Sequence, residues 1–180
     1  MKKLLLLLCF VFIHQVVYPV YFKHLGMSDG LSQVSVMSIY QDCLGRMWFG
    51  TREGVSIYDG ERMRVYKGWE NLDPKSSINV LLGHECDHLT GNRQGDIFFR
   101  TCDSLVRYDI REEKFCVVSG CKAKTITSAD GDIWTGYDDM VCRYDEKGDS
   151  LQLYAKTNTP GISSLLISGK KIWIGTYEGL

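Results

Sequence analysis

One spacing recurs along the chain and constrains its fold more than any other feature. An aromatic residue stands ten residues before a Tyr-Asp pair in three places, and a glycine precedes each of these aromatics by three residues. The three aromatics are Trp48, Phe98 and Trp134, and Trp173 marks a fourth, shorter repeat. They are 50, 36 and 39 residues apart, so a unit of about 40 residues repeats along the chain.

Within the first repeat, the sequence predicts four short strands joined by tight turns. Residues 34–41, 47–51, 55–58 and 63–66 carry many apolar, β-branched or aromatic side chains, and turn sequences separate them. The Asp59-Gly60 pair is a strong hairpin signal. Such a sheet cannot bury both faces alone, so it must stack on its neighbours. The chain is therefore predicted to be all-β, a β-propeller of four-stranded antiparallel blades.

The recurring residues are predicted to be structural rather than catalytic. A tryptophan in the second strand can bury roughly 150–250 Å² against the next blade. The recurring acids are expected to accept hydrogen bonds from turn amides; they are Asp42, Asp59, Asp109 and Asp145. The second repeat is less regular, with Phe98 in place of tryptophan and Arg100 in place of glycine. Such drift is compatible with a packing role, where approximate volume suffices.

The first residues have the pattern of an export signal. Lys2 and Lys3 precede an apolar run that is interrupted by His14 and Gln15 before it could span a bilayer as a helix. Residues 1–19 are predicted to be a signal peptide, with an uncleaved anchor as the alternative. Residues 20–180 are then the propeller region, with repeats at about 34–66, 80–118, 123–155 and 162–180.

Composition excludes several classes of partner and leaves two interpretations of the cysteines, a disulfide or buried free thiols. The net charge of −1 gives no electrostatic reason to expect binding to nucleic acid or to an anionic membrane. Six cysteines follow the predicted signal, and their spacing resembles no compact disulfide framework. Cys116 and Cys121 could pair across a bend at Gly120, but buried free thiols are the preferred interpretation. No cofactor is predicted.

Two places that do not repeat are candidates for ligand binding. The long connection at 67–79 places an aromatic among amides and acids, as a sugar-binding rim does; it includes Trp69, Glu70, Asn71, Asp73 and Lys75. The alternative is an ordinary long loop or a plug at a blade edge. On a strand, His84, Cys86 and His88 would share one face and could hold Zn²⁺. The preferred alternative is two partly solvated imidazoles near the channel, with one buried thiol and no metal.

The first repeat resembles the repeat of two-component regulator propellers, which form the periplasmic region of hybrid two-component sensors of Bacteroidetes-type bacteria. The matching residues are Gly45, Trp48, Gly50, Thr51, Gly54, Val55, Tyr58 and Asp59. The last repeat matches through residues 173–176 and 179–180, so the resemblance extends from about residue 21 to the end.

The resemblance implies a function for a larger protein. It predicts a periplasmic, ligand-sensing propeller region of an inner-membrane hybrid histidine kinase, with a glycan or another nutrient as ligand and a homodimer in the full-length protein. This chain would be its N-terminal fragment or a truncated gene product, with about three and a half blades, open, prone to aggregation and without the catalytic part. The alternatives are a scaffold or protein-interaction propeller, or a propeller enzyme such as a lyase or glycosidase.

Overall fold

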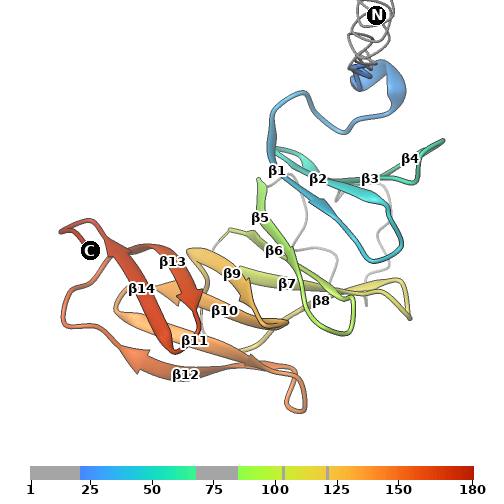
Figure 1. Cartoon of the computed structure of the whole chain (residues 1–180). Coiled ribbons are helices and arrows are strands. Elements are labelled where there is room, and N and C mark those ends of the chain that lie inside the picture. Colours follow the sequence, from blue (N-terminus) through green and yellow to red (C-terminus); the bar gives the residue numbers. More distant parts are fainter. Residues whose placement is uncertain (1–20, 68–84, 103, 121) are drawn as a thin grey trace, which may run out of the picture.

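The computed structural model describes residues 21–67, 85–102, 104–120 and 122–180, and this part of the chain is built of β-strands. Its only helical element is the short 3₁₀ turn η1 (Met27–Asp29). The strands form four sheets in chain order (Figure 1). We call these sheets blades 1 to 4. The prediction of an all-β chain with four-stranded antiparallel sheets is confirmed.

Within every blade, each strand pairs with the next one along the chain. Blade 1 contains β1 (Val36–Gln41), β2 (Met47–Thr51), β3 (Gly54–Tyr58) and β4 (Met63–Tyr66). Blade 2 contains β5 (Cys86–Gly91), β6 (Ile97–Thr101), β7 (Ser104–Asp109) and β8 (Lys114–Val117). Blade 3 contains β9 (Thr125–Ala129), β10 (Asp132–Tyr137), β11 (Met140–Asp145) and β12 (Ser150–Lys156). Blade 4 contains β13 (Ile162–Ser168) and β14 (Lys171–Thr176).

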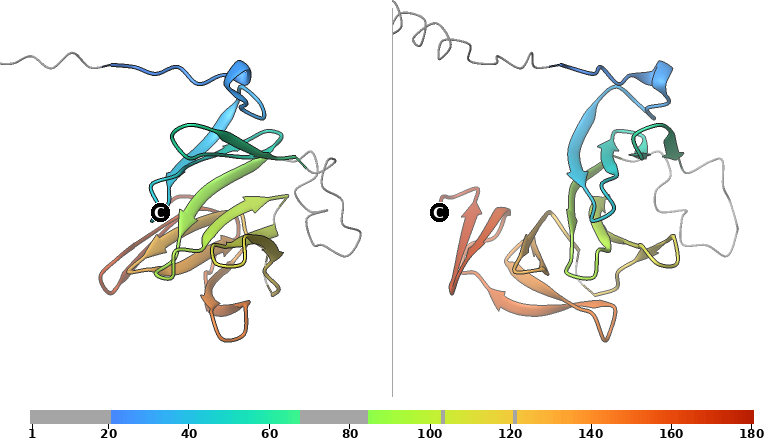
Figure 2. Two further views of the ribbon diagram at one scale, coloured as in Figure 1. Left: turned by 90° about the vertical axis from the view of Figure 1, so that its right-hand side faces the viewer. Right: turned by 45° about the vertical axis from the view of Figure 1, so that its right-hand side comes forward.

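The blades follow one another around an arc, as a propeller requires. The first strands contact each other in order, β1 with β5, β5 with β9, and β9 with β13. They therefore line the inner side of the arc, and the later strands of each blade lie further out. Figure 2 shows that the arc is open, with blades 1 and 4 at its two ends.

Packing between blades explains the recurring spacing. Trp48 on β2 is fully buried, and its ring meets Tyr108 on β7 edge-on at 4.9 Å between ring centroids. Phe98 on β6 meets Tyr144 on β11 in the same way at 4.9 Å. The aromatic of one blade's second strand thus packs on the tyrosine of the next blade's third strand. Edge-on aromatic pairs add to the stabilisation that burial of their area provides.

Two glycines permit this close stacking. A Cβ on Gly50 would lie 2.4 Å from the Cys86 carbonyl oxygen of the next blade, and one on Gly136 would lie 2.6 Å from Ile162 Cγ2. Neither glycine has a positive φ, so the requirement is for space and not for a special backbone conformation. At these two positions, the first strand of the following blade occupies the volume that a side chain would need.

The predicted first strand differs from the structure in extent and in burial. It begins at Val36 rather than at residue 34, and Val34 is 67% exposed. Residues 36, 38 and 40 are partly buried, whereas residues 37, 39 and 41 are exposed. Ile39 is 59% exposed because it lies on the face of blade 1 that points away from blade 2.

The prediction of buried thiols holds for two cysteines and is wrong for two others. Cys86 and Cys142 lie on strands and are buried. Cys43 and Cys102 are exposed because they occupy the turns between first and second or second and third strands. Cys121 lies outside the described residues, so its pairing with Cys116 stays a prediction.

Candidate functional site

Of the residues predicted to bind a ligand, the described part of the chain contains one, His88. The others lie outside the described residues: Trp69, Glu70, Asn71, Asp73 and His84, together with Lys75. The structure therefore places His88 and its surroundings, while the predicted sugar-binding rim stays a prediction.

His88 lies at an irregular point of β5. Its φ is 54°, and the pairing of β5 with β6 shifts register between Asp87 and Thr90. The extra residue breaks the alternation of side chains. Cys86 and Leu89 pack in one apolar core, whereas His88 stays partly exposed. The prediction that Cys86 and His88 share a face is therefore wrong. Within the described ranges, no group of three or more His, Cys, Asp or Glu side chains could hold a metal ion.

His88 belongs instead to a cluster with Asp87 and Arg100, which we call the β5–β6 cluster. His88 Nδ1 lies 2.9 Å from Asp87 Oδ1. Arg100 Nε donates to the same oxygen at 2.8 Å, and Arg100 Nη2 contacts the other carboxylate oxygen. Arg100 can face Asp87 in this way because the two residues are opposite each other in the β5–β6 ladder.

The cluster holds its charges in a half-buried position. Burial by itself raises the pKa of Asp87, but the hydrogen bonds from His88 and Arg100 and their charges bring the pKa down to about 2. Asp87 is therefore ionised at neutral pH. Its side chain is 11% exposed, against 34% for that of His88, so the imidazole is the part that solvent can reach. The cluster can offer hydrogen bonds to a polar ligand through that ring.

The cluster is specific to blade 2. Arg100 occupies the position of Gly50, Gly136 and Gly175, which all the other blades keep as glycine. Comparison of the repeats within this chain singles out Arg100, but its partner Asp87 can be identified only when the strand pairing is known. Because a site for one ligand is built once, this non-repeating cluster is the strongest candidate for recognition among the described residues.

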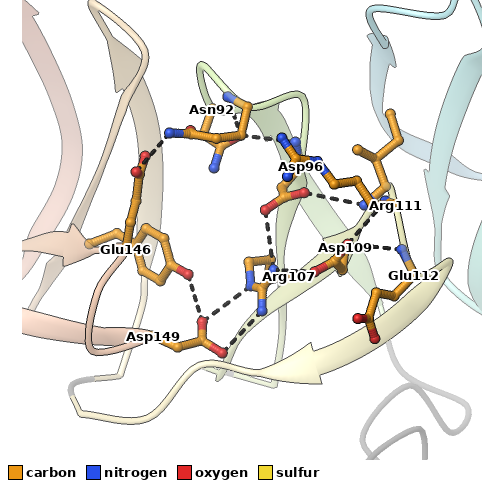
Figure 3. A network of polar contacts seen from close by, with 11 residues as sticks. Asn92, Asp96, Arg107, Asp109, Arg111, Glu112, Glu146 and Asp149 are labelled. Atoms are coloured by element: carbon orange, nitrogen blue, oxygen red, sulfur yellow. Dashed lines mark hydrogen bonds and ion pairs between the residues drawn. The ribbon is translucent and has the colours of Figure 1, made fainter.

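A second polar network connects blades 2 and 3 at the opposite ends of the strands (Figure 3). Arg107 on β7 lies at its centre. Its Nη1 contacts Asp96 at 3.1 Å and Asp109 at 3.0 Å, and its Nε and Nη2 each donate to Asp149 of blade 3 at 3.1 Å. The Tyr144 hydroxyl donates to Asp149 at 2.6 Å.

The electrostatics of this second polar network are those of a structural connection between blades. Burial lowers the pKa of Arg107, but the hydrogen bond to Asp149 and the neighbouring acids raise it above the ordinary value. Burial and the bond to Asp149 both raise the pKa of Tyr144. At neutral pH, Arg107 thus stays protonated and Tyr144 stays neutral. Every charged group has a partner, so this Arg107 network joins two blades rather than activating a nucleophile.

The recurring turn acids have the role that the sequence predicts. Asp59 Oδ1 accepts hydrogen bonds from the amides of Glu61 and Arg62 at 2.9 and 2.7 Å. Asp109 Oδ1 accepts from the amides two and three residues later, both at 3.0 Å. Asp145 accepts from the amide of Lys147 at 3.3 Å. These carboxylates close the turns between third and fourth strands and do not converge on one site.

Asp42 has a further role, which sequence reasoning missed. Its side chain is fully buried. Oδ1 accepts from the amides of Leu44 and Arg46, while Oδ2 accepts from Arg46 Nε at 2.7 Å and from Trp48 Nε1 at 2.8 Å. The buried carboxylate thus links the turn to the indole of the recurring tryptophan.

The second repeat changes this arrangement in a concerted way. Phe98 has no N–H group, and neutral Asn92 stands where Asp42 stands in the first repeat. Asn92 Oδ1 keeps the two turn contacts, from the amides of Gln94 at 3.1 Å and Asp96 at 2.9 Å. The irregularity of the second repeat is therefore more than volume-conserving drift, because the acceptor changes together with the donor.

A groove of about 420 Å³ lies along blade 3 and is lined by residues such as Arg93, Asp132, Arg143, Gln152 and Tyr154. Asp132, Arg143 and Gln152 face the same side as Trp134, which is the side that points to blade 4. The Trp134 ring meets Tyr154 of its own blade at 4.7 Å. The corresponding aromatics Trp48 and Phe98 are instead covered by a third strand of the next blade. The groove thus lies on the face of blade 3 that corresponds to the stacking faces of blades 1 and 2.

No family model matches the chain. Over 59 residues, which are 33% of this chain and 4% of the other, it is 39% identical to "Histidine kinase P4" of Formosa agariphila. Its structure is similar to the extracellular domain of the hybrid two component system BT3049 from B. thetaiotaomicron, with a TM-score of 0.72 and 24% identity, over 87% of this chain and 24% of that one. The chain has the fold of a two-component extracellular domain.

A second such domain, from BT4673 of the same organism, gives a TM-score of 0.67 at 16% identity over 86% of this chain and 21% of that one. A streptogramin B lyase gives a TM-score of 0.51 at 19% identity over 84% of this chain and 54% of that one. The chain spans about a quarter or less of the two extracellular domains. In the described residues, no helix is long and apolar enough to cross a membrane.

Proposed function

We propose that this chain is part of the extracytoplasmic sensor region of a hybrid two-component histidine kinase, exported to the periplasm by residues 1–19. The observation that carries the proposal is the shared fold with the BT3049 extracellular domain over 87% of the chain, together with the match to a histidine kinase. On this proposal the chain contributes blades to a sensor and performs no catalysis itself. Its likeness to the lyase concerns the fold alone and supports no proposal of catalysis.

We further propose a nutrient glycan as the ligand. The β5–β6 cluster offers an imidazole beside a carboxylate and a guanidinium, a combination that can donate to and accept from sugar hydroxyls. The predicted rim residues Trp69, Glu70, Asn71 and Asp73 would add an aromatic platform and further polar groups, and His84, predicted to lie near the channel, would add a second imidazole. To signal, such a ligand must bind the two states of the sensor with different affinity.

Calorimetric titration of the chain with a panel of plant and host oligosaccharides tests the ligand proposal. The expected result is saturable binding of one class of glycan, weakened at least about tenfold by His88→Ala, which removes the solvent-facing ring (about 1.4 kcal/mol per tenfold). Asp145→Asn, in an exposed turn outside the cluster, is the matched control and should bind as the parent does. Binding that His88→Ala leaves unchanged would place recognition elsewhere, and absence of binding across the panel would refute glycan sensing by this chain.

Export is tested separately with an alkaline phosphatase fusion after residue 180, because the enzyme is active only outside the cytoplasm. Activity that disappears when residues 1–19 are deleted is the expected result. An inactive fusion would contradict the periplasmic location. The signalling role is tested in the gene itself, where the proposal expects a membrane span and a histidine kinase in the same reading frame.

A further inference from the structure

His88 has a backbone conformation that the other strand residues avoid. Among the described residues, it is the one residue other than glycine that lies inside a strand with a positive φ, of 54°. This left-handed region is unfavourable for a residue with a side chain. The register shift between Asp87 and Thr90 marks a bulge at the same place, and bulges commonly re-aim a side chain beside a functional site. The bulge therefore sets the direction of the His88 ring.

The β5–β6 cluster holds the carboxylate beside this ring in its ionised form. Arg100 approaches Asp87 as a fork, with Nε donating to Oδ1 at 2.8 Å and Nη2 contacting Oδ2. A guanidinium is always protonated and is only a donor, so both carboxylate oxygens must accept from it. An ionised carboxylate is itself only an acceptor. Asp87 therefore has no proton to donate to His88.

The position of the proton on the His88 ring follows from this arrangement. Nδ1 lies 2.9 Å from Asp87 Oδ1, which is hydrogen-bond distance. Because the carboxylate can only accept, Nδ1 must carry the hydrogen and donate it. A neutral imidazole has one N–H group, so its Nε2 is then an acceptor. Within the described residues no hydrogen bond occupies Nε2, and the side chain is 34% exposed.

We propose that Asp87 fixes His88 in the Nδ1–H tautomer, so that the site presents Nε2 to its ligand as a hydrogen-bond acceptor. This inference rests on the proposed role of the cluster in binding a glycan, and it specifies the chemical group that is bound. The ligand must direct a donor, such as a sugar hydroxyl, at Nε2. A carboxylate or carbonyl oxygen at the same place would leave two acceptors facing each other without a proton. Asp87 is then a positioning residue, because it acts on the ligand through His88.

Nitrogen NMR of the ligand-free 180-residue chain with ¹⁵N-labelled histidine tests the tautomer directly, because protonated and bare ring nitrogens differ widely in chemical shift. The chain has four histidines, and comparison with His88→Gln identifies the signals of His88. At mildly alkaline pH, where an ordinary imidazole is neutral, we expect a protonated Nδ1 and a bare Nε2. The exposed His24 is the internal control and should show both tautomers. A protonated Nε2, a ring that keeps both protons, or a mixture like that of His24 would overturn the proposal.

Removing the carboxylate tests the positioning role of Asp87. Asp87→Ala alone leaves the half-buried Arg100 without this partner and can lose the fold. The double variant Asp87→Ala with Arg100→Gly removes both charges and restores the glycine of the other blades, and circular dichroism checks that it folds. In this double variant, His88 should show both tautomers, as His24 does. A ring that stays fixed as Nδ1–H would mean that Asp87 does not position it.

Singly modified oligosaccharides test the direction of the hydrogen bond to the ligand. For a panel member that binds in calorimetric titration, each hydroxyl is replaced in turn by hydrogen or by an O-methyl group. The deoxy form lacks both donor and acceptor, whereas the O-methyl form keeps the acceptor oxygen and loses the donor alone. The hydroxyl that contacts His88 is the one whose modification has no effect in His88→Ala. In the parent, both modified forms at that position should bind at least about tenfold more weakly.

The two modified forms separate an acceptor from a donor at His88. If the deoxy form is weakened and the O-methyl form binds as the unmodified sugar does, the site donates the hydrogen and the proposal is wrong. If no oligosaccharide binds, the glycan proposal fails, whereas the tautomer of the ligand-free chain still decides whether Nε2 is an acceptor.

Discussion

Replacing Asp42 by asparagine tests whether the buried carboxylate is what connects the turn to the recurring tryptophan. The substitution keeps the oxygen that accepts hydrogen bonds from the two turn amides, but it can place an NH₂ group against Arg46 Nε and Trp48 Nε1. In the parent, these two nitrogens lie 2.7 and 2.8 Å from Oδ2. Two buried donors then lose their acceptor, at about 1–3 kcal/mol each. Removing one partner of a buried ion pair costs about 3–5 kcal/mol, so we expect a loss of this size in the free energy of unfolding.

The second repeat suggests a double-mutant cycle. Trp48→Phe removes the indole donor and, together with Asp42→Asn, recreates the Asn92 and Phe98 combination of the second repeat. Because the donor that Asp42→Asn would leave unpaired is then absent, the double variant should be more stable than the sum of the two losses by about 1–3 kcal/mol.

Urea unfolding followed by far-ultraviolet circular dichroism measures all four members of this cycle, with Asp59→Asn as the control. Asp59 is exposed and its side chain accepts from turn amides alone, so its change should cost under about 1 kcal/mol. A loss for Asp42→Asn no larger than that of Asp59→Asn would refute the reasoning, as would additivity within about 0.5 kcal/mol.

Three further predictions follow from the same contacts. The folded pKa of Asp87 is about 2, below its ordinary 3.8, so its stabilising contribution is present above about pH 4 and lost as the pH falls toward 2. Asp87→Asn should therefore flatten the decline of the unfolding free energy across that pH window, and an unchanged slope in urea titrations would contradict this. Arg107→Gln leaves three carboxylates without their cation and should lower the free energy of unfolding by about 2–4 kcal/mol, whereas Arg143→Gln, with a 48% exposed side chain, should lower it by under about 1 kcal/mol. Equal losses in urea unfolding would argue against a structural role of the Arg107 network. Gly50→Ala places a Cβ 2.4 Å from the Cys86 carbonyl oxygen and should lower the unfolding free energy by about 1–3 kcal/mol, and a tolerated alanine would mean that the blades are further apart than described.

Much of the fold could be predicted from the sequence because blade stacking repeats. The spacing between each second-strand aromatic and its Tyr-Asp pair reflects one junction used several times, as the contacts of Trp48 with Tyr108 and of Phe98 with Tyr144 show. The turn acids were predictable for a similar reason, because an aspartate accepting nearby amides is a local interaction. Periodicity and local chemistry therefore led to the correct class of fold.

Contacts between distant residues could not be predicted in this way. Asp87 and Arg100 meet because the pairing of β5 with β6 shifts register around His88, and no local sequence pattern predicts a bulge at that residue. Likewise, Arg107 reaches Asp149 across a blade junction, 42 residues along the chain. A comparison of the repeats could have indicated the concerted change of Asp42 to asparagine and of Trp48 to phenylalanine, but its cause appears only in the hydrogen bond between them.

The stacking of consecutive repeats as blades is the central structural claim, and one measurement tests it directly. Nuclear Overhauser contacts between the ring protons of Trp48 and Tyr108 should be strong, because their ring centroids are 4.9 Å apart and edge-on. The tyrosine of the indole's own repeat, Tyr58, should give no comparable contact. Strong contacts of Trp48 with Tyr108 and of Phe98 with Tyr144 are the result that blade stacking predicts. Contacts of Trp48 with Tyr58 in their place would mean that each repeat folds on itself, and would contradict the propeller arrangement.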